Sequence, residues 1–244
     1  MRDAALLQAV AALALLLVVV LLLGSLRSVV AGAGGEPRGG VGSSSPADRD
    51  LAALRSAARQ ADPAGKRHYR LARALADGAV EAEIEGRGEE ALALLAEGLR
   101  AGEVALERRP ASSRYATLLG ELHGLTARRG GVVGRMRHGR RAAELYARAV
   151  ELDPGNARAR VGVGIARLET PVMFGGSTAA ALEAFRAAQH LDPRCEEAWI
   201  WEGIALARGG DVEAARRALG HALEINPAST HARHELANLD GSTE

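Results

Sequence analysis

Three nearly identical short segments of this chain end in proline, and the last two prolines are 34 residues apart. These segments are residues 149–154, 188–193 and 222–227, and each reads Ala-x-x-(Leu/Ile)-(Asp/Asn)-Pro. Residues 105–110 form a looser copy and residues 58–63 a faint one. A repeat with a period of about 20 to 50 residues indicates a stack of similar structural units. Such stacks usually present a binding surface, so the repeat constrains both fold and function.

The last copy, residues 197–227, indicates what one unit is. Apolar and small residues recur at three- and four-residue spacing on both sides of Gly209-Gly210-Asp211, which predicts two amphipathic helices. A left-handed glycine can end the first helix, and Asp211 can cap the second. Pro227 should end the second helix, because the residue before a proline is pushed out of the helical region.

This unit resembles the tetratricopeptide repeat (TPR), whose pattern has a Trp, a Leu-Gly pair and a Tyr, followed by Ala, Phe and Pro. The last copy matches it at Trp199, Gly203, Leu206, Ala215, Leu219, Ala222 and Pro227. Earlier copies match at Gly164, Ala181, Phe185 and Ala188, and at Leu119, Gly120, Ala142, Tyr146 and Ala149. Glu202 departs from the pattern, because the family has Leu at that place.

The resemblance implies an all-α, TPR-type helical solenoid over residues 48–241. Its four helix pairs are expected at about residues 65–110, 113–154, 157–193 and 196–227, and a polar cap helix at 229–239 covers the last interface. The composition suits this fold, since a chain rich in Ala, Leu and Gly with only 3% aromatic residues favours closely packed helices over a sheet.

The N-terminal residues 1–30 contain an apolar stretch, residues 4–23, in which only Gln8 is polar. As a helix it would span about 30 Å, the thickness of the hydrocarbon core of a bilayer. We expect a signal anchor that attaches the chain to a membrane. The alternative is a secretory signal peptide cleaved near the small residues 31–33. Residues 31–47, rich in Gly, Ser and Pro, predict a flexible linker.

Two features of this segment give opposite orientations. A short N-terminal tail usually stays inside, which places the repeats outside the cytoplasm. Arg27 and Arg38 follow the apolar stretch, however, whereas only Arg2 precedes it, and this asymmetry favours the reverse. We expect a membrane-anchored chain with its repeats outside the cytoplasm, or an exported protein if the signal is cleaved.

The resemblance also implies a groove, because the first helix of each TPR unit lines the concave face. The residues at those positions are Arg114, Thr117, Glu121, Arg158, Val161, Ile165, Glu197, Ile200, Ile204, His231 and His234. An apolar centre with charged edges suits a peptide segment of a partner protein. Some TPR domains clamp an acidic C-terminal tail with Lys and Asn. Other residue types occupy those places here, so that activity is not expected.

Two inserts lengthen the turns within the second and third units. The first, residues 127–141, carries six arginines and no acidic residue: Arg128, Arg129, Arg135, Arg137, Arg140 and Arg141. It is either an anion-binding rim or a solvated loop. In the second, residues 170–178, Met173 and Phe174 either fill the gap between units or form an exposed apolar contact. Both inserts should lie on one rim, where they could touch and form a small lobe.

The motifs of catalysis are missing from this sequence: it has no His-Glu-x-x-His, no Gly-x-Ser-x-Gly and no dinucleotide-binding glycine pattern. His231 and His234 are too few to hold a metal alone, and a net charge of +1 does not favour nucleic acid. We therefore expect no enzyme activity, no cofactor and no metal.

The expected function is that of a membrane-tethered adaptor, which binds another protein in its groove within an envelope-associated assembly. The alternative is an accessory subunit that delivers a solute or an apoprotein to a transporter or a maturation complex. This alternative comes from the loop at residues 171–177, which resembles one in exported bacterial TPR proteins and in the TPR subunits associated with TRAP-type transporters.

Overall fold

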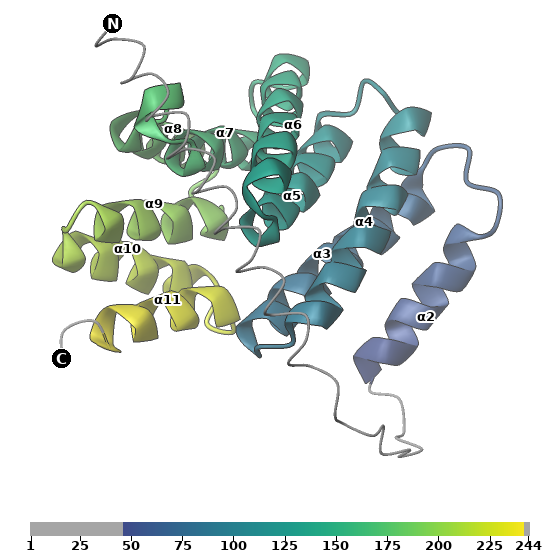
Figure 1. Cartoon of the computed structure of the whole chain (residues 1–244), viewed down its shortest axis with the longest axis horizontal. Coiled ribbons are helices and arrows are strands. Elements are labelled where there is room, and N and C mark those ends of the chain that lie inside the picture. The colour runs from purple at the N-terminus through teal and green to yellow at the C-terminus, as the bar shows by residue number, and fades with distance from the viewer. Residues whose placement is uncertain (1–45, 242–244) are drawn as a thin grey trace, which may run out of the picture. The chain divides into compact units, whose positions relative to one another are not determined.

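The computed structural model describes residues 46–241, and every regular element among them is a helix (Figure 1). The predicted membrane segment, residues 4–23, and nearly all of the predicted linker lie outside the described residues. Among the residues that are described, none of the helices has both the length and the apolar character needed to cross a membrane.

Four helix pairs follow a first helix, α2 (Pro46–Ala58). The pairs are α3 (Lys66–Ile84) with α4 (Gly88–Arg108), α5 (Ser113–Arg129) with α6 (Val132–Leu152), α7 (Ala157–Glu169) with α8 (Thr178–Leu191), and α9 (Glu196–Arg208) with α10 (Val212–Ile225). A last helix, α11 (Thr230–Gly241), packs on α9 and α10. Each pair also packs on the next, so the predicted all-α, TPR-like solenoid is confirmed for the described part of the chain.

Several helices begin at a side-chain cap that the sequence supplies. Asn156 accepts a hydrogen bond from the backbone N–H of Ala159 at 3.0 Å, and Ser112 and Ser177 cap α5 and α8 in the same way. Asp211 caps α10 through the N–H of Ala214, after Gly210 has turned the chain with a φ of 87°. The predicted glycine stop and Asp cap between the last two paired helices are therefore confirmed.

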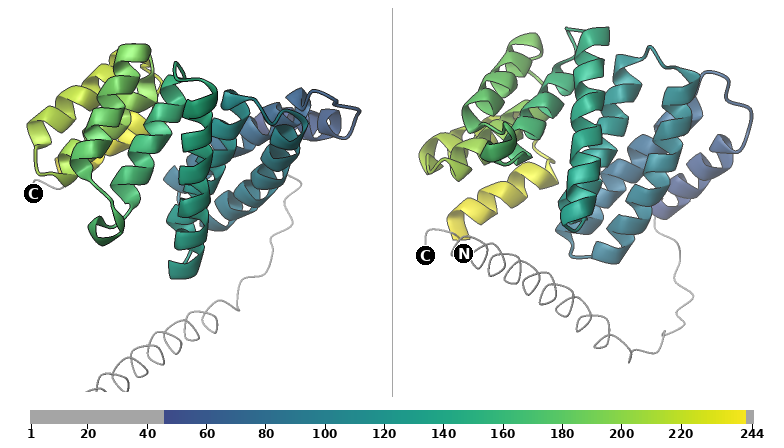
Figure 2. Two further views of the ribbon diagram at one scale, coloured as in Figure 1. Left: turned by 90° about the horizontal axis from the view of Figure 1, so that it is seen from above. Right: turned by 45° about the horizontal axis from the view of Figure 1, so that its top comes forward.

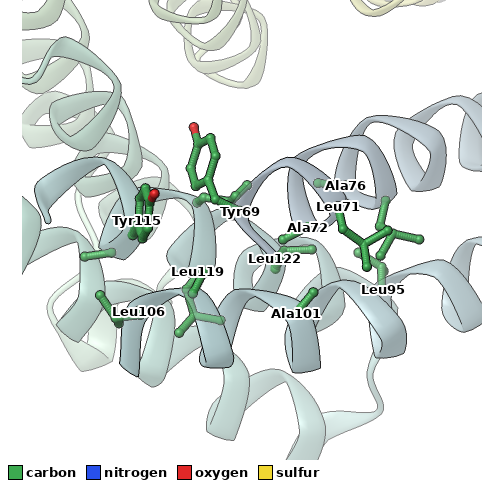
Figure 3. Close-up of a cluster of buried hydrophobic side chains, with 14 of the residues drawn as sticks. Tyr69, Leu71, Ala72, Ala76, Leu95, Ala101, Leu106, Tyr115, Leu119 and Leu122 are labelled. Carbon is green, nitrogen blue, oxygen red and sulfur yellow. The ribbon is translucent and has the colours of Figure 1, made fainter. Parts of the chain in front are cut away.

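The core runs between the helices as three clusters of buried apolar side chains. Figure 3 shows the largest, in which Tyr69 of α3, Leu95 of α4 and Leu119 and Leu122 of α5 come together. The other two clusters contain Phe185 and Leu219, respectively. Small residues let helices approach closely, as where Leu219 of α10 lies against Gly203 of α9. A Cβ atom at Gly203 would stand 2.7 Å from Cγ of Leu219.

The curvature of the solenoid brings its two ends together. Helix α11 packs against α9 and also contacts α3, the first helix of the first pair (Figure 1). The helices α3, α5, α7, α9 and α11 therefore surround a common centre, whereas α4, α6, α8 and α10 lie outside them (Figure 2). The inner helices thus line a concave face whose two ends approach each other where α11 contacts α3.

The structure corrects what the sequence suggested about the inserts. Residues 127–141 are not a loop, because they lie at the end of α5 and the start of α6, with only Gly130 and Gly131 between the helices. Extending an existing helix adds a hydrogen bond for every residue fixed, which accounts for the longer helices.

The second insert, residues 170–178, contains a short 3₁₀ turn, η1 (Val172–Phe174), whose three side chains are exposed. The expectation that Met173 and Phe174 fill the gap between units is therefore wrong, and the alternative of an exposed apolar contact is the observed one. Helix α6 and η1 do not pack on each other, so the two inserts do not form a lobe.

Candidate functional site: a cavity inside the ring of helices

The inner helices line a cavity of about 430 Å³ that is open to solvent on one side. Every inner helix contributes to its wall, from Arg73 and Asp77 on α3 to Thr230 and His231 on α11. Apolar and charged side chains alternate around it. A concave site with a mainly apolar lining and a few polar groups is the usual form of a binding site for a small ligand or a peptide side chain.

Seven of the residues predicted to lie in the groove line this cavity: Glu121, Arg158, Val161, Ile165, Glu197, Ile200 and His231. They belong to α5, α7, α9 and α11, so helices far apart in the sequence supply neighbouring parts of one wall. Val161 and Ile200 are almost fully buried, which makes them part of the packing behind the cavity. Ile165 and Glu197 are more accessible and can reach an occupant.

The remaining predicted groove residues do not line the cavity. Arg114 donates a hydrogen bond to the hydroxyl of Tyr69 at 2.8 Å and stands over its ring. Thr117 is buried, donates to the carbonyl of Ser113 and accepts from the amide of Asn156. Ile204 is partly buried between two apolar clusters, and His234 is exposed outside the cavity.

Ion pairs fix most of the charged groups of the wall. Glu121 binds Arg73 at 2.7 Å across the gap between α5 and α3, and Arg158 forms an ion pair with Glu197 between α7 and α9. These pairs leave little net charge inside the ring. The Nε atom of Arg73 is buried without a hydrogen-bond partner, whereas its Nη2 atom holds Glu121.

Arg128, Trp201 and His231 form an aromatic corner of the cavity. The guanidinium of Arg128 stands over the ring of Trp201 with 5.6 Å to its centroid, within the range of a cation–π contact. The edge of His231 meets the same ring, with 6.2 Å between centroids. Burial, and then the neighbouring Arg128 and His234, lower the pKa of His231 to about 4. His231 is therefore neutral near pH 7 and can donate or accept a hydrogen bond.

The cavity residues that the sequence did not predict include Arg73, Asp77 and Trp201. Arg73 and Asp77 belong to the first pair, whose sequence matches the repeat poorly, so no groove positions were assigned there. Trp201 was visible as a large aromatic residue two places after the family's Trp position at Trp199, and that spacing puts it on another face of the helix.

The six arginines of the first insert do not form one rim. Arg128 lines the central cavity, whereas Arg129 contacts Glu83 and the carbonyl of Gly88. The side chain of Arg135 is exposed at the start of α6. The others, Arg137, Arg140 and Arg141, border a second hollow between α4 and α6.

That second hollow measures about 550 Å³ and also contains a pair of histidines. The Nδ1 atoms of His123 and His138 are 2.9 Å apart, a hydrogen-bond distance. Among the residues that the structure describes, no three His, Cys, Asp or Glu side chains are arranged to hold a metal ion.

Comparisons with known proteins identify similar folds. Residues 133–171 and 173–230 match the family model described as tetratricopeptide repeat. A thermophilic TPR protein from Thermus thermophilus has 19% sequence identity to this chain, covers 79% of it with 90% of its own length, and superposes with a TM-score of 0.60. No curated protein matches the chain in sequence.

Two other solved structures are similar at a lower TM-score. YrrB, a TPR protein with an unusual peptide-binding site, shares 21% identity over 77% of this chain and 82% of its own, with a TM-score of 0.41. The first TPR domain of Spaghetti, bound to an HSP90 peptide, has 18% sequence identity to this chain. The match covers 50% of this chain and 92% of that domain, with a TM-score of 0.38. At these identities the likeness concerns the fold alone.

Proposed function

From the premise that this chain is a tetratricopeptide repeat protein, we propose that its central cavity binds a short segment of another protein. TPR proteins mediate contacts between proteins, and some of them bind peptides. The observation that carries the proposal is the composition of the cavity wall, where apolar side chains from four inner helices lie beside a guanidinium and a neutral imidazole.

The size of the cavity limits what can enter it. Sites of about 300–1,000 Å³ take ligands of drug size, and this one measures about 430 Å³. An α-helix with its side chains is about 10–12 Å wide, so a volume of about 430 Å³ is too small for a helix of several turns. We therefore propose that the cavity takes the side chains of a few residues, such as a chain terminus or a loop tip.

The chemistry of the wall specifies the kind of segment. An apolar or aromatic side chain would pack on Trp201 and Ile165 and would contribute about 1.5–3 kcal/mol of favourable free energy if fully enclosed. A carboxylate beside it would meet the guanidinium of Arg128, which is accessible in the cavity wall. The proposed ligand is thus an apolar residue next to an acidic group.

The cavity can be tested with the fluorescence of Trp201. The full chain with Trp199→Phe keeps Trp201 as its only tryptophan, and peptides are selected on it from a random displayed library. Selected peptides should shift the emission of Trp201, and Arg128→Glu with Ile165→Ser should weaken their binding at least tenfold. Arg217→Glu, an exposed charge reversal on α10, is the matched control. Peptides that bind all variants equally would refute the cavity as the site.

We further propose that the solenoid works as an adaptor tethered to a membrane, in an envelope-associated assembly outside the cytoplasm. The support is the apolar sequence of residues 4–23 and the linker that follows it. Alkaline phosphatase fused after Glu244 should be active, and the mass of the mature protein should include residues 1–30. An inactive reporter would place the repeats in the cytoplasm, and a shorter protein would indicate a cleaved signal.

A second function is favoured by the volume of the cavity, which also suits a small solute. In that case the chain would be an accessory subunit that hands a solute to a transporter or a maturation complex. Thermal unfolding separates the two functions, because a ligand that binds only the folded state raises the melting temperature. A small-molecule collection that stabilises the protein, while the peptide library yields no binder, would support this second function.

A further inference from the structure

Two turns of the solenoid expose an unusual number of large apolar side chains. In the described part of the chain nine large hydrophobic residues are exposed, and six of them lie at these turns. The start of α6 exposes Val132, Val133 and Met136, and η1 exposes Val172, Met173 and Phe174. Val172 is 84% exposed and Met173 is 82% exposed, whereas the other three, Leu92, Leu152 and Leu191, reach 39–44%.

Both turns lie on the same edge of the solenoid. Successive helices are antiparallel, so the α5–α6 turn and the α7–α8 loop are on one side and the ends of α6 and α8 are on the other. Figure 2 shows one end of α6 and the α7–α8 loop protruding in the same direction. We call the six exposed apolar residues of the two turns the apolar rim.

The charge around the apolar rim is positive. The exposed Arg135 and Arg137 flank Met136. The other arginines of residues 128–141 are engaged away from the rim, since Arg128 lines the central cavity, Arg129 contacts Glu83, and Arg140 and Arg141 pair with Glu144. Beside η1, the exposed Arg167 donates to the carbonyl of Gly175 at 3.5 Å. The nearest acidic residue before η1, Glu169, is paired with Arg208 at 2.8 Å.

We propose that the apolar rim rests on a lipid bilayer that carries anionic headgroups. Apolar side chains flanked by arginines are the composition with which protein segments enter the boundary between headgroups and acyl chains. Each Arg near such a surface gains from its negative potential. The six side chains stand on two separate protruding turns, whereas a stable protein interface needs one contiguous, well-packed patch.

The part of the chain outside the structure suits the same partner. The apolar residues 4–23 have the composition to enter a bilayer, and the 22 residues between them and α2 reach up to about 70 Å when extended. A tether of that length allows the solenoid to turn its apolar rim to the membrane. The proposal is independent of what the central cavity binds.

The test measures which edge of the solenoid touches lipid. In the full chain with Cys195→Ala, single cysteines at Val133 and Met173 carry an environment-sensitive fluorophore. Leu152 and Leu191, exposed on the opposite edge, are the matched control positions. The protein is reconstituted in phosphatidylcholine vesicles with or without phosphatidylglycerol, together with a lipid that bears a quencher.

With phosphatidylglycerol present, the probes at positions 133 and 173 should shift to the blue and lose most of their emission, whereas those at 152 and 191 should keep theirs. Arg135→Gln with Arg137→Gln should reduce the quenching at 133. Every variant carries the same residues 4–23, so a difference between the positions reports contact of the rim.

Equal quenching at both edges would overturn the proposal, and so would a failure of the chain to float with the vesicles. A third outcome would overturn it as well. If the probes at positions 133 and 173 shift to the blue without vesicles, and the shift grows with protein concentration, the partner of the apolar rim is a second copy of the chain.

Discussion

The ring of Tyr146 on α6 occupies the space that a side chain at Gly162 on α7 would need. On its other side the ring meets Gly120 of α5, where a Cβ atom would lie 2.8 Å from Cε1 of Tyr146. One buried side chain thereby joins two helix pairs, and its ring also forms part of the cavity wall. Burial raises the pKa of the Tyr146 hydroxyl, so the phenol stays neutral.

Gly162→Ala should therefore destabilise the solenoid, although alanine favours a helix by about 1 kcal/mol over glycine. The added methyl group would overlap the Tyr146 ring, and such overpacking costs about 1–3 kcal/mol. Gly220→Ala is the matched control, because α10 has open space there and the same change should stabilise it. Denaturant unfolding measures both, and the smaller Tyr146→Leu should reduce the cost of Gly162→Ala in a double-mutant cycle.

The helix pairs were predictable because the spacing of apolar and small residues is a local signal. Tyr146 and Gly120 fall on repeat positions, and their contact follows from the family pattern. The closure of the ring has no such signal, since it arises from small rotations between successive units that add up until α11 meets α3. Gly130 and Gly131 indicated a long loop, whereas two extended helices satisfy more backbone hydrogen bonds.

The candidate site was predictable to the extent that repeat position determines which way a side chain points. Glu121 and Ile165, which were predicted to face the groove, line the cavity. Thr117 lies one turn before Glu121 but is drawn into hydrogen bonds with Asn156 of the next pair, a contact that depends on how the pairs pack. Arg73 lies in a pair whose sequence has lost the repeat pattern, and only the structure reveals it.

Glu202 shows how a departure from the repeat is accommodated. Its carboxylate is buried in the place where the family has Leu, and it accepts hydrogen bonds from Arg186 at 2.9 Å and Gln189 at 2.6 Å. Both donors come from α8 of the preceding pair. A buried charge that keeps such partners contributes little net stability, whereas one that loses them is strongly unfavourable.

Removing the donors to Glu202 and replacing Glu202 itself should have different effects on the free energy of unfolding. Arg186→Met with Gln189→Met should lower the free energy of unfolding by about 1–3 kcal/mol, because the carboxylate stays buried without donors. Glu202→Leu alone should be close to neutral. Adding Glu202→Leu to the Arg186 and Gln189 variant should restore stability in denaturant unfolding. If the double variant unfolds as the parent does, the carboxylate is not held as the structure indicates.

The lowered pKa values of His123 and His231 predict that the protein loses stability in mild acid. Burial, and then His138, Arg141 and Arg137, lower the pKa of His123 to about 4, and the pKa of His231 is also about 4. In the unfolded chain both titrate near 6.5. The unfolded state therefore takes up protons first as the pH falls. The contribution of the two neutral histidines to the free energy of unfolding is complete above about pH 6.5 and is lost as the pH approaches 4.

Between about pH 6 and 5 the free energy of unfolding should change with pH by about 1.4 kcal/mol per pH unit for each of these two histidines. Burial, and then Arg137, also lower the pKa of His138, which adds to the slope in this range, whereas Asp62 and Glu97 have lowered pKa values and reduce stability only in stronger acid. Guanidinium unfolding from pH 8 to pH 5 measures the slope. His123→Gln and His231→Gln should each reduce it, and both together should remove most of it, while the range from pH 7.5 to 8 stays flat in every variant. An unchanged slope in the double variant would show that other groups cause the acid sensitivity.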